Sequence, residues 1–574
     1  MVRIYRLFLS FFYSVYRVMR KLYRRFFVSS SESVKYSDIA RTQDKLLAAL
    51  KPVSSNPTFL IVLYPSAHSH EGLLATIQSL YSQAYSNWKI VINEPSVNYF
   101  SNAEVWLDSI NTDARIKLNL YSNRMSVGSC IHSITCDYVL PMFVLGVFHK
   151  ECLNAIARYI EDEPKAKVIY TDEDFYNEHY VRVRPHFKPK WNPDLFFSTN
   201  YVSNVCVFDK KMLVDINFFP HTNYSLVLKS LGLCLSDEVI HVPFVLFHNL
   251  FSASEEASSF NSVLHRSELA ALKTYFKEDA VGVSDGLLPN TYKVSWPIPD
   301  NQPLVSIIIP TRNAVNLVRQ CIESLYLKTR YNNFEVLLVD NQSDDKESLK
   351  YFEELNLSGK VRLIRYNKVF NYSAINNFAV EHAAGEILVF MNNDIELISE
   401  NWLNEMVSQT IREEIGCVGA MLYYQNNTIQ HAGVVLGLGR CAGHSHKYYS
   451  RYDNGYMNRL KVVQNYSAVT AACLGVTKNI FEEVGGFNAE YLPVAFNDVD
   501  FCIKVFNAGY RNLWTPYAEM YHHESVSRGV DDTPEKQQRA QKEIQYMQRT
   551  WHLDRIVDPS YSRWLTIGRE DFTI

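Results

Sequence analysis

The stretch "PLVSIIIPTRNAVNLVRQCIESLYLKTRYNNFEVLLVDN" (residues 303–341) decides the fold class of this chain. Its first aliphatic run, at residues 305–309, is too short and too uniform for a helix, so it indicates a buried strand. A helical pattern follows that run, and a second aliphatic run comes after the helix. Strand, helix and strand in this order form a βαβ unit, so we predict an α/β fold with a mostly parallel sheet.

The same pattern occurs earlier in the chain, which indicates an internal duplication. The stretch "PTFLIVLYPSAHSHEGLLATIQSLYSQAYSNWKIVINE" (residues 57–94) aligns with the first one, and "CLNAIARYI" answers "WLNEMVSQT" further on. Residues between the two repeats are rich in turn formers and indicate a linker. We therefore predict this order of segments: a basic amphipathic segment at 1–50, a first domain at 51–285, a linker at 286–302, a second domain at 303–530 and a C-terminal helical extension at 531–574.

The composition is that of a soluble globular protein with more than one domain. The chain has 574 residues, of which 47% are hydrophobic and 21% charged, and its net charge is only −4. Such a charge gives no reason to expect a nucleic-acid partner. None of the ten cysteines belongs to a C-x-x-C pair, which argues against a zinc or redox centre. No apolar run reaches the roughly 18 to 20 residues of a membrane-spanning helix, and no signal cleavage site is evident, so we expect a cytoplasmic protein.

The N-terminal stretch "MVRIYRLFLSFFYSVYRVMRKLYRRFF" has a strong local charge, with seven Arg and Lys residues and no acid. Wound at about 100° per residue, its apolar side chains fall on one side and its basic ones on the other. This pattern is typical of a helix that lies in a membrane interface. A helix that packs on the body of the protein itself is the alternative.

Polar residues follow three predicted strands of the second domain, where an open parallel sheet binds its ligands. They are Pro310, Thr311 and Arg312 after the first strand, Asp340 and Asn341 after the second, and Asn392, Asn393 and Asp394 after a later one. A helix cap would explain Asp340 or Asp394 taken singly. Three polar strand ends on one edge of a sheet instead predict a binding site.

A second polar group lies in "VAFNDVDFCIKVFNAGYRNLWTPYAEMYHHES" (residues 494–525). The start of an amphipathic helix carries Asn497, Asp498 and Asp500, and a later strand-like run ends in His522 and His523. A capping role explains one of these acids but not both.

Two nucleotide-binding motifs are absent or incomplete in the sequence. The phosphate loop G-x-x-x-x-G-K-[ST] does not occur. The stretch "GLGRCAG" (residues 437–443) has its third glycine one place too late for a dinucleotide fingerprint, so we interpret it as a flexible loop.

These residues resemble those of a family 2 glycosyltransferase of the GT-A fold, in the branch that builds bacterial cell-surface polysaccharides. The resemblance covers residues 303 to about 529 and is carried by "VSIIIPTRN", "LLVDNQSDD", "NYSAINNFAVEHAAGEILVFMNNDIEL", "QNYSAVTAACLGV", "GGFNAEYLPVAFNDVDFCIKV" and "YHHESVSRG". The first half is similar more faintly, through "YTDEDFYNEHYVRVRPHFKPKWNPDLFFSTNYV". The resemblance implies two tandem GT-A domains of the α/β class, of which the first is degenerate.

The resemblance also implies roles for particular residues. Asp498 falls at the position of the catalytic base, and Asp394 is the last acid of a D-x-D metal motif whose first acid is here an amide. His522 stands where some relatives have a further metal ligand, with His523 as an alternative. Contacts to the nucleotide sugar are implied for Pro310, Thr311, Arg312, Asp340, Asn341, Asn371, Asn376, Asn392 and Asn393.

The implied chemistry explains why acids and amides should end a buried strand. The donor releases a diphosphate, so the site must hold negative charge, and a divalent Mn²⁺ or Mg²⁺ ion with oxygen ligands does so. The acceptor hydroxyl is a poor nucleophile, so a carboxylate such as Asp498 should remove its proton. A single displacement with one base inverts the anomeric centre.

The first half lacks most of these groups. Aligned on the repeats, Asp394 corresponds to Val144, Asn392 to Met142, Asp498 to Asn223, Asp500 to Ser225 and Asp340 to Glu94. The acids Asp172, Glu173 and Asp174 in "YTDED" are then a surviving second site, a solvated turn or an acceptor-binding loop. We predict that the first domain is a degenerate copy that scaffolds the second or positions the acceptor.

The favoured function is transfer of a sugar from a nucleotide-sugar donor to a lipid-linked surface glycan such as O-antigen or capsule. The N-terminal helix would hold the enzyme at the inner face of the plasma membrane. A processive synthase is disfavoured because spanning helices and a Q-x-x-R-W motif are missing. An enzyme with two active domains and a non-catalytic glycan-binding scaffold are the remaining alternatives.

Overall fold

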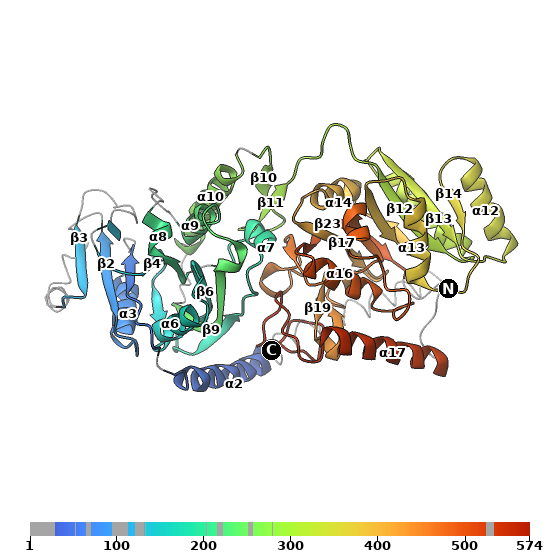
Figure 1. The fold of residues 1–574 in the computed structure, drawn as a ribbon. Helices are drawn as coiled ribbons and strands as arrows, with labels where there is room; N and C mark the ends of the chain where they lie inside the picture. The colour runs from blue at the N-terminus through green and yellow to red at the C-terminus, as the bar shows by residue number, and fades with distance from the viewer. Residues whose placement is uncertain are drawn as a thin grey trace, which may run out of the picture.

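A computed structural model describes residues 29–51, 53–64, 70–94, 113–120, 131–132, 134–202, 204–214, 222–250, 256–277, 279–523 and 533–574. The basic helix predicted for the first 28 residues lies outside this description. Figure 1 shows two α/β halves side by side, the first in blue to green and the second in yellow to red. Within the described residues, no helix combines the length and the apolar character needed to cross a membrane.

The first half contains a mixed, largely parallel sheet. From one edge to the other its strands are β3 (Ile116–Leu120), β2 (Trp88–Glu94), β1 (Phe59–Leu63), β4 (Tyr138–Met142), β8 (Cys206–Asp209), β6 (Val168–Tyr176), β9 (Val239–Leu250) and β5 (Gly146–Phe148), and β7 (Arg182–His186) pairs with β6. The second half repeats this order with β14 (Arg362–Arg365), β13 (Phe334–Asp340), β12 (Val305–Thr311), β15 (Ile387–Met391), β22 (Cys473–Thr477), β17 (Ile415–Tyr423), β23 (Arg511–His522) and β16 (Ile395–Leu397).

The two sheets also share the direction of every pairing along these paths. In both, the first four strands are parallel, the next strand is antiparallel to its neighbours, and the last strand is antiparallel to the long one beside it. The predicted α/β class with two tandem GT-A-like sheets is therefore confirmed. The short strands β18 (Ile429–His431) and β21 (Gln464–Asn465) extend the second sheet.

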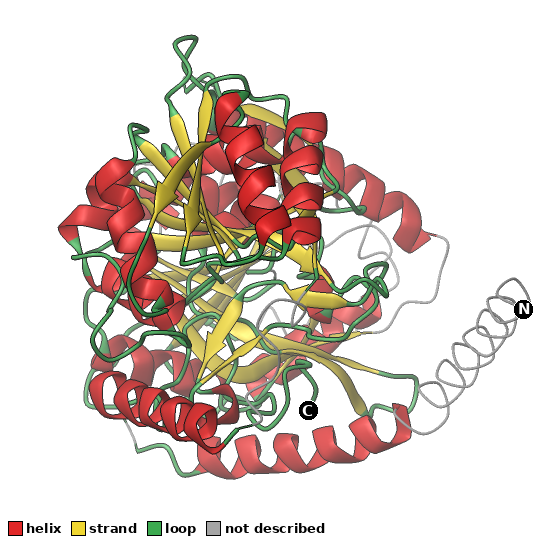
Figure 2. Ribbon diagram, turned by 90° about the vertical axis from the view of Figure 1, so that its right-hand side faces the viewer, coloured by secondary structure: helices red, strands yellow, loops and turns green. Residues whose placement is uncertain are grey.

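Helices cover the outer faces of the sheets, as Figure 2 shows with helices in red and strands in yellow. The first half has α3 (His70–Tyr81), α6 (Cys152–Asp162), α7 (Pro193–Ser198), α8 (Lys210–Val214), α9 (Asn223–Ser230) and α10 (Glu256–Tyr275). The second half has α11 (Val315–Lys328), α12 (Lys346–Leu357), α13 (Tyr372–His382), α14 (Trp402–Thr410), α15 (Lys478–Glu483) and α16 (Asn497–Asn507). Two more helices, α2 (Ser29–Ala48) and α17 (Pro534–Trp551), lie along the lower side of the molecule in Figure 1.

The segment between the halves is folded. The hairpin of β10 (Gly282–Asp285) and β11 (Tyr292–Ser295) begins it. After the hairpin, the ring of Trp296 lies 4.1 Å from the guanidinium of Arg412, in the second half. Residues that we predicted as a linker therefore contact both halves.

Buried polar contacts join the two halves directly. Arg412 of the second half pairs with Asp194 of α7 at 2.6 Å, and both side chains are almost fully buried. Beside them, Asn192 and Asn465 exchange two hydrogen bonds of 2.8 and 2.9 Å between side chain and backbone. Because strand β21 contains Asn465, the first half holds the edge of the second sheet.

Candidate active site

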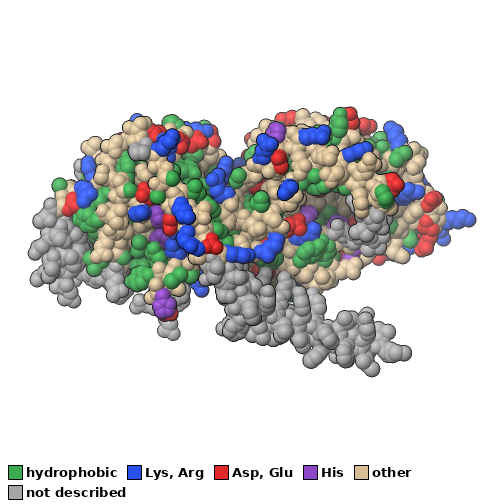
Figure 3. Space-filling model, turned by 90° about the horizontal axis from the view of Figure 1, so that it is seen from below, with side chains coloured by type: hydrophobic (Ala, Val, Ile, Leu, Met, Phe, Trp, Pro, Cys, Tyr) green, Lys and Arg blue, Asp and Glu red, His purple; other side chains and the backbone are tan. Residues whose placement is uncertain are grey.

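The candidate active site is a cleft at the carboxyl ends of β12, β13 and β15, with a cavity volume of about 780 Å³. Figure 3 shows the underside of the molecule, where the surface of the second half is hollowed and histidine side chains are visible. The cleft brings together most of the predicted site residues: Pro310, Thr311, Arg312, Asn341, Asn392, Asn393, Asp394, Asp498 and His522 all line it.

Hydrogen bonds connect the ends of β12, β13 and β15 in this cleft. The amide of Asn393 donates to Oγ1 of Thr311 at 2.9 Å, and the backbone N–H of Asn341 donates to the carbonyl of Thr311 at 2.8 Å. Arg312 follows directly and is exposed. An exposed guanidinium at the ends of parallel strands suits an anionic group such as a diphosphate.

Asp394 and His522 face each other in the cleft. Nε2 of His522 lies 3.1 Å from Oδ1 of Asp394, while Nδ1 of the same ring lies 2.6 Å from Oε1 of Gln430. An amide oxygen only accepts hydrogen bonds, so Nδ1 carries a proton, and Nε2 is the ring nitrogen that faces Asp394. Oδ1 of Asp394 is buried and has no hydrogen-bond partner in the described part of the chain.

This pair fits a divalent cation. A ring nitrogen and a carboxylate oxygen 3.1 Å apart are both atoms that bind divalent cations in proteins. Burial acts to raise the pKa of Asp394, but the hydrogen bond and positive charge of a protonated His522 ring outweigh burial and hold that pKa below its ordinary value. A bound cation would take the place of that ring proton. No group of three or more His, Cys, Asp or Glu side chains suited to a metal occurs among the described residues. A metal here would therefore take its other ligands from the substrate.

Asp498 lies in the same cleft, on the second residue of α16. Its Oδ2 accepts a hydrogen bond from the backbone N–H of Ala471 at 3.0 Å. Burial raises the pKa of Asp498 above its ordinary value, although hydrogen bonds to the carboxylate oppose this. A carboxylate whose pKa is raised toward neutral is a better proton acceptor than an ordinary aspartate.

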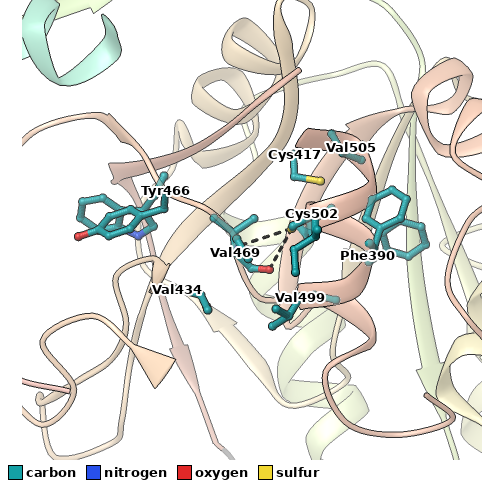
Figure 4. Packing of buried hydrophobic residues seen from close by; sticks show 14 of the residues in the cluster. Phe390, Cys417, Val434, Tyr466, Val469, Val499, Cys502 and Val505 are labelled. Carbon is teal, nitrogen blue, oxygen red and sulfur yellow. Dashed lines mark hydrogen bonds between the residues drawn. The ribbon is translucent and has the colours of Figure 1, made fainter. Parts of the chain in front are cut away.

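Packing fixes the helix that positions this carboxylate. Figure 4 shows Cys502 of α16 against Val469, with the thiol 3.5 Å from the backbone nitrogen and 3.6 Å from the carbonyl oxygen of Val469. The loop that contains Val469 leads to Ala471, so the same contact holds both the helix and the N–H donor of Asp498. Phe496, just before the helix, adopts a left-handed φ of 57° that a bulky residue rarely occupies.

Sequence reasoning missed the wall of the cleft formed by the hairpin of β19 (Val434–Leu436) and β20 (Ala442–His444). His444 lines the cleft, and its Nδ1 lies 2.9 Å from Nδ1 of the buried His431. Burial, with Lys447 and His522 nearby, lowers the pKa of His444 to about 3, so its ring is neutral. The sequence feature that could have indicated this wall is the pair of histidines in "GHSHK" (residues 443–447).

The segment that we interpreted as a flexible loop forms part of this wall. It contains the 3₁₀ helix η4 (Leu438–Arg440) and the first two residues of strand β20. The glycines there serve the hairpin, since Gly437 has a φ of 85° at its turn.

Two residues predicted to contact the nucleotide sugar are engaged elsewhere. Asp340 is 1% exposed, and its carboxylate accepts hydrogen bonds from Ser343 and pairs with Arg365. Asn371 caps α13, because its side chain accepts from the backbone N–H of Ala374 at 2.9 Å. Neither lines the cavity.

Asn376 and His523 also lie outside the cavity lining. Asn376 is fully buried and donates to the carbonyl of Tyr372, one helical turn earlier, so it stabilises α13. His523 follows His522 in sequence but bonds with Glu396 at 2.9 Å. Of the two histidines, only His522 has a ring nitrogen close to the Asp394 carboxylate, at 3.1 Å.

Asp500 is a structural residue. It is 1% exposed, and its Oδ1 accepts a hydrogen bond from the indole of Trp551 at 2.9 Å. Of the two acids in the first turn of α16, Asp498 is therefore the one that faces the cleft.

Strand register shows what the first half has in place of this site. Phe59 pairs with Tyr138 as Val305 pairs with Ile387, so residue 138 matches residue 387. Continuing from that match, Asp394 corresponds to Leu145 and Asn392 to Phe143, one place later than the sequence alignment gave. All four candidate counterparts, Met142, Phe143, Val144 and Leu145, are apolar.

The counterpart cleft is occupied by aromatic packing. The ring of Phe143 stacks on Tyr64, the counterpart of Pro310, at 4.8 Å between ring centres. Asn249 takes the place of His522, since Gly146 pairs with it as Ile395 pairs with His522. Glu94 ends β2 as Asp340 ends β13.

The acids of "YTDED" lie within strand β6 and are buried, which rules out a solvated turn. Asp172 accepts from the backbone N–H of Lys188 and bonds with His241, and Glu173 lies near His186 and Lys188. Asp174 bonds with Tyr36, Arg182 and His248. Each of the three acids therefore has partners within the first half.

Comparison with known proteins supports the family resemblance of the second half. Residues 306–484 match the sequence model of the family described as "Glycosyl transferase family 2". The second half of the chain therefore carries a glycosyltransferase domain of family 2.

Two long relatives match nearly the whole chain. An uncharacterized protein, y4gI of Sinorhizobium fredii, is 38% identical over 90% of this chain and 59% of its own length. The O-antigen biosynthesis protein RfbC of Myxococcus xanthus is 30% identical over 93% of this chain and 42% of its own length. The chain thus spans about half the length of these relatives.

A solved structure with a similar fold is the mannosyltransferase PcManGT from Pyrobaculum calidifontis in complex with GDP-Man and Mn²⁺. It is 17% identical, covers 51% of this chain and 76% of its own, and has a TM-score of 0.33. A likeness of this size adds nothing to what the chain's own topology shows.

Proposed function

We propose that the protein is a glycosyltransferase that moves a sugar from a nucleotide-sugar donor to a glycan hydroxyl, with inversion at the anomeric carbon. The observation that carries this proposal is the cleft itself. On a domain that matches family 2, it brings the unpartnered Asp394 oxygen and His522 into the same cavity as Asp498.

The mechanism assigns different tasks to these side chains. Asp394 and His522 would hold a divalent Mn²⁺ or Mg²⁺ ion, which when bound offsets the charge of the leaving diphosphate. Arg312, exposed at the end of β12, adds a positive charge on the donor side. Asp498 accepts the proton of the acceptor hydroxyl as that oxygen attacks, and one displacement of this kind inverts the sugar carbon.

The acceptor that we propose is a lipid-linked surface glycan. The relative RfbC is named for O-antigen biosynthesis, and a shorter relative from Escherichia coli is named as a glucosyltransferase acting on a diphosphoundecaprenol-linked sugar. An enzyme with two active domains is disfavoured because Leu145 takes the place of Asp394, which leaves no carboxylate where the metal pair would lie.

The test is a panel of UDP-, GDP- and dTDP-sugars with Mn²⁺, screened by thermal unfolding and then by sugar transfer. One donor class should stabilise the protein, by about 2.7 kcal/mol at 100 times its Kd, and should be consumed. Excess chelator should remove both effects. No stabilisation and no donor consumption with any sugar would overturn the proposal and favour a non-catalytic scaffold.

We propose in addition that the enzyme works at the inner face of the plasma membrane. Its N-terminal stretch has seven basic residues, and each contributes roughly 1 kcal/mol near an anionic surface. A chain that lacks residues 1–28 should therefore leave the membrane fraction while its donor-dependent stabilisation is unchanged. A truncated chain that still sediments with anionic vesicles would contradict this.

A further inference from the structure

The C-terminal extension, residues 531–574 and described from residue 533 on, reaches both halves of the molecule. Its helix α17 ends at Trp551, and an irregular segment follows. In that segment the indole of Trp564 donates to the carbonyl of Pro243 in the first half at 2.6 Å. The extension begins beyond residue 484, where the family match ends, so that match gives it no role.

One carboxylate of the extension holds the loop that precedes Asp498. Glu543, on α17, is 1% exposed, and its Oε1 accepts from the backbone N–H groups of Val494 and Ala495 at 2.9 and 3.2 Å. These two residues line the cleft, and the strained Phe496 follows them. A left-handed aromatic residue persists only where its surroundings fix it, and Glu543 fixes the two peptide groups before it.

A second carboxylate holds the opposite wall. Oε1 of Glu570 accepts from the backbone N–H of His444 at 2.8 Å, beside the cleft. A β-carbon on Gly443 would lie only 2.8 Å from the same oxygen, so the glycine permits this approach. The hairpin pairs only three residues of each strand, and an isolated hairpin of that size is marginal in water.

A third carboxylate holds the other strand of this hairpin. Asp558 is 3% exposed, and its Oδ2 accepts from the backbone N–H of Leu436 at 2.6 Å. Each strand of the hairpin is therefore bonded to an acid of the extension.

We infer that the C-terminal extension is part of the active site, where Glu543, Asp558 and Glu570 act as positioning residues for its acceptor side. The ends of β12, β13 and β15 form the side that would take the sugar donor. Glu543 holds the residues just before the helix of Asp498, and Val434 of the hairpin bonds with Ala468, in the loop that leads to the N–H donor of Asp498. The inference rests on the proposed function, because Asp498 identifies the acceptor side only if it accepts a proton there.

The experiment compares Glu570→Ala with Glu570→Gln in the full chain. Alanine removes the acceptor of the His444 N–H, whereas glutamine keeps an oxygen at the same place. Asp554→Ala is the control, because Asp554 is exposed on the same segment and pairs only with its neighbour Arg555 among the contacts described. Acceptor kcat/KM is measured with the donor found in the panel and a membrane glycolipid extract, and donor binding with the matching nucleoside diphosphate and Mn²⁺.

We expect Glu570→Ala to lower acceptor kcat/KM by about 10- to 100-fold, the equivalent of one lost hydrogen bond to a charged group. Glu570→Gln should stay within about threefold of the wild type, and nucleoside diphosphate affinity should not change in either. Hydrogen exchange in peptides covering residues 434–446 should be faster in Glu570→Ala only. Glu543→Ala should likewise lower acceptor kcat/KM without changing nucleoside diphosphate affinity. Hydrogen exchange should then be faster around residues 493–496.

Two results would overturn the inference. One is an unchanged acceptor kcat/KM in both alanine variants, and the other is a loss of donor binding that matches the loss of transfer, which would indicate a merely structural role. If the wild type binds no nucleoside diphosphate, the proposed function fails separately. The exchange rates of residues 434–446 then decide whether Glu570 positions the hairpin.

Discussion

Asp394 and Asp498 are carboxylates of one cleft whose surroundings move their pKa values in opposite directions. Burial acts to raise both values, but His522 reverses the effect at Asp394, whereas at Asp498 burial prevails. An acid that stays charged suits a metal, and an acid whose pKa is raised suits proton transfer. The two residues therefore have different roles although their side chains are identical.

The first residue-scale prediction concerns Asp498. Asp498→Asn keeps the shape of the side chain but cannot accept a proton, so transfer should slow by roughly 10²- to 10⁴-fold while donor affinity is retained. Single-turnover measurements with saturating donor test this. In the wild type the rate should fall as the pH drops through the raised pKa of Asp498, and that limb should vanish in the variant. A variant with full activity would exclude Asp498 as the base.

The second residue-scale prediction concerns Asp394. Asp394→Ala removes the unpartnered oxygen, so Mn²⁺ should no longer increase the affinity for the nucleoside diphosphate, and transfer should fall to the level seen in excess chelator. Calorimetric titration with and without Mn²⁺ measures this coupling. Thr428→Ala is a suitable control, since this exposed hydroxyl bonds only locally, with Asn426. Metal-dependent binding that persists in Asp394→Ala would remove this residue from the metal site.

At the scale of elements, the ion pair between Asp194 of α7 and Arg412 of the second half gives a testable prediction about stability. Asp194→Ala leaves the buried Arg412 without its closest partner, which should cost about 3–5 kcal/mol. Denaturant unfolding followed by fluorescence measures the loss. Glu400→Ala, which removes an exposed pair with Arg330, should have little effect. Equal stability of the two variants would show that the α7 contact contributes nothing.

The same pair gives a pH dependence of definite sign. Burial acts to raise the pKa of Asp194, but Arg412 and Arg511 outweigh burial and lower it. A carboxyl with a lowered pKa in the folded state stabilises the protein above its unfolded pKa, about 3.9. That stabilisation is lost as the pH falls through the folded value. The difference in stability between wild type and Asp194→Ala should therefore shrink below about pH 4.

Strands that show a local sequence pattern were predictable from the sequence. Polar clusters whose hydrogen-bond partners lie far away along the chain were not. The aliphatic runs of β1 and β12 indicate buried strands by themselves. The acids of β6 seemed to belong to a turn or a site because their partners, such as His248 and Tyr36, are more than 70 residues away. The resemblance implies a ligand contact for Asn371 and Asn376, whereas the structure shows Asn371 as the cap of α13 and Asn376 buried in that helix.

On the scale of the whole molecule, the two halves keep one topology and differ in chemistry. All matched strands retain their order and direction, yet the pair Tyr64 and Phe143 stacks where Pro310 and Asn392 line the cleft. The first half instead contributes Asp194 and Asn192 to the interface. Duplication therefore explains the fold, whereas the side chains at the strand ends differ between the two copies.

The final prediction tests this asymmetry with matched substitutions. Asn223 is the first residue of α9, which takes the place of α16 in the first half, and its side chain donates to the carbonyl of Asn204 at 2.7 Å. Asn223→Ala should lower stability by the roughly 0.5–1.5 kcal/mol of one hydrogen bond and leave the transfer rate per folded molecule unchanged. Asp498→Asn should do the reverse, with a large loss of rate. Single-turnover rates of both variants, corrected for the folded fraction, decide the matter, because comparable rate losses would mean that the first half also takes part in catalysis.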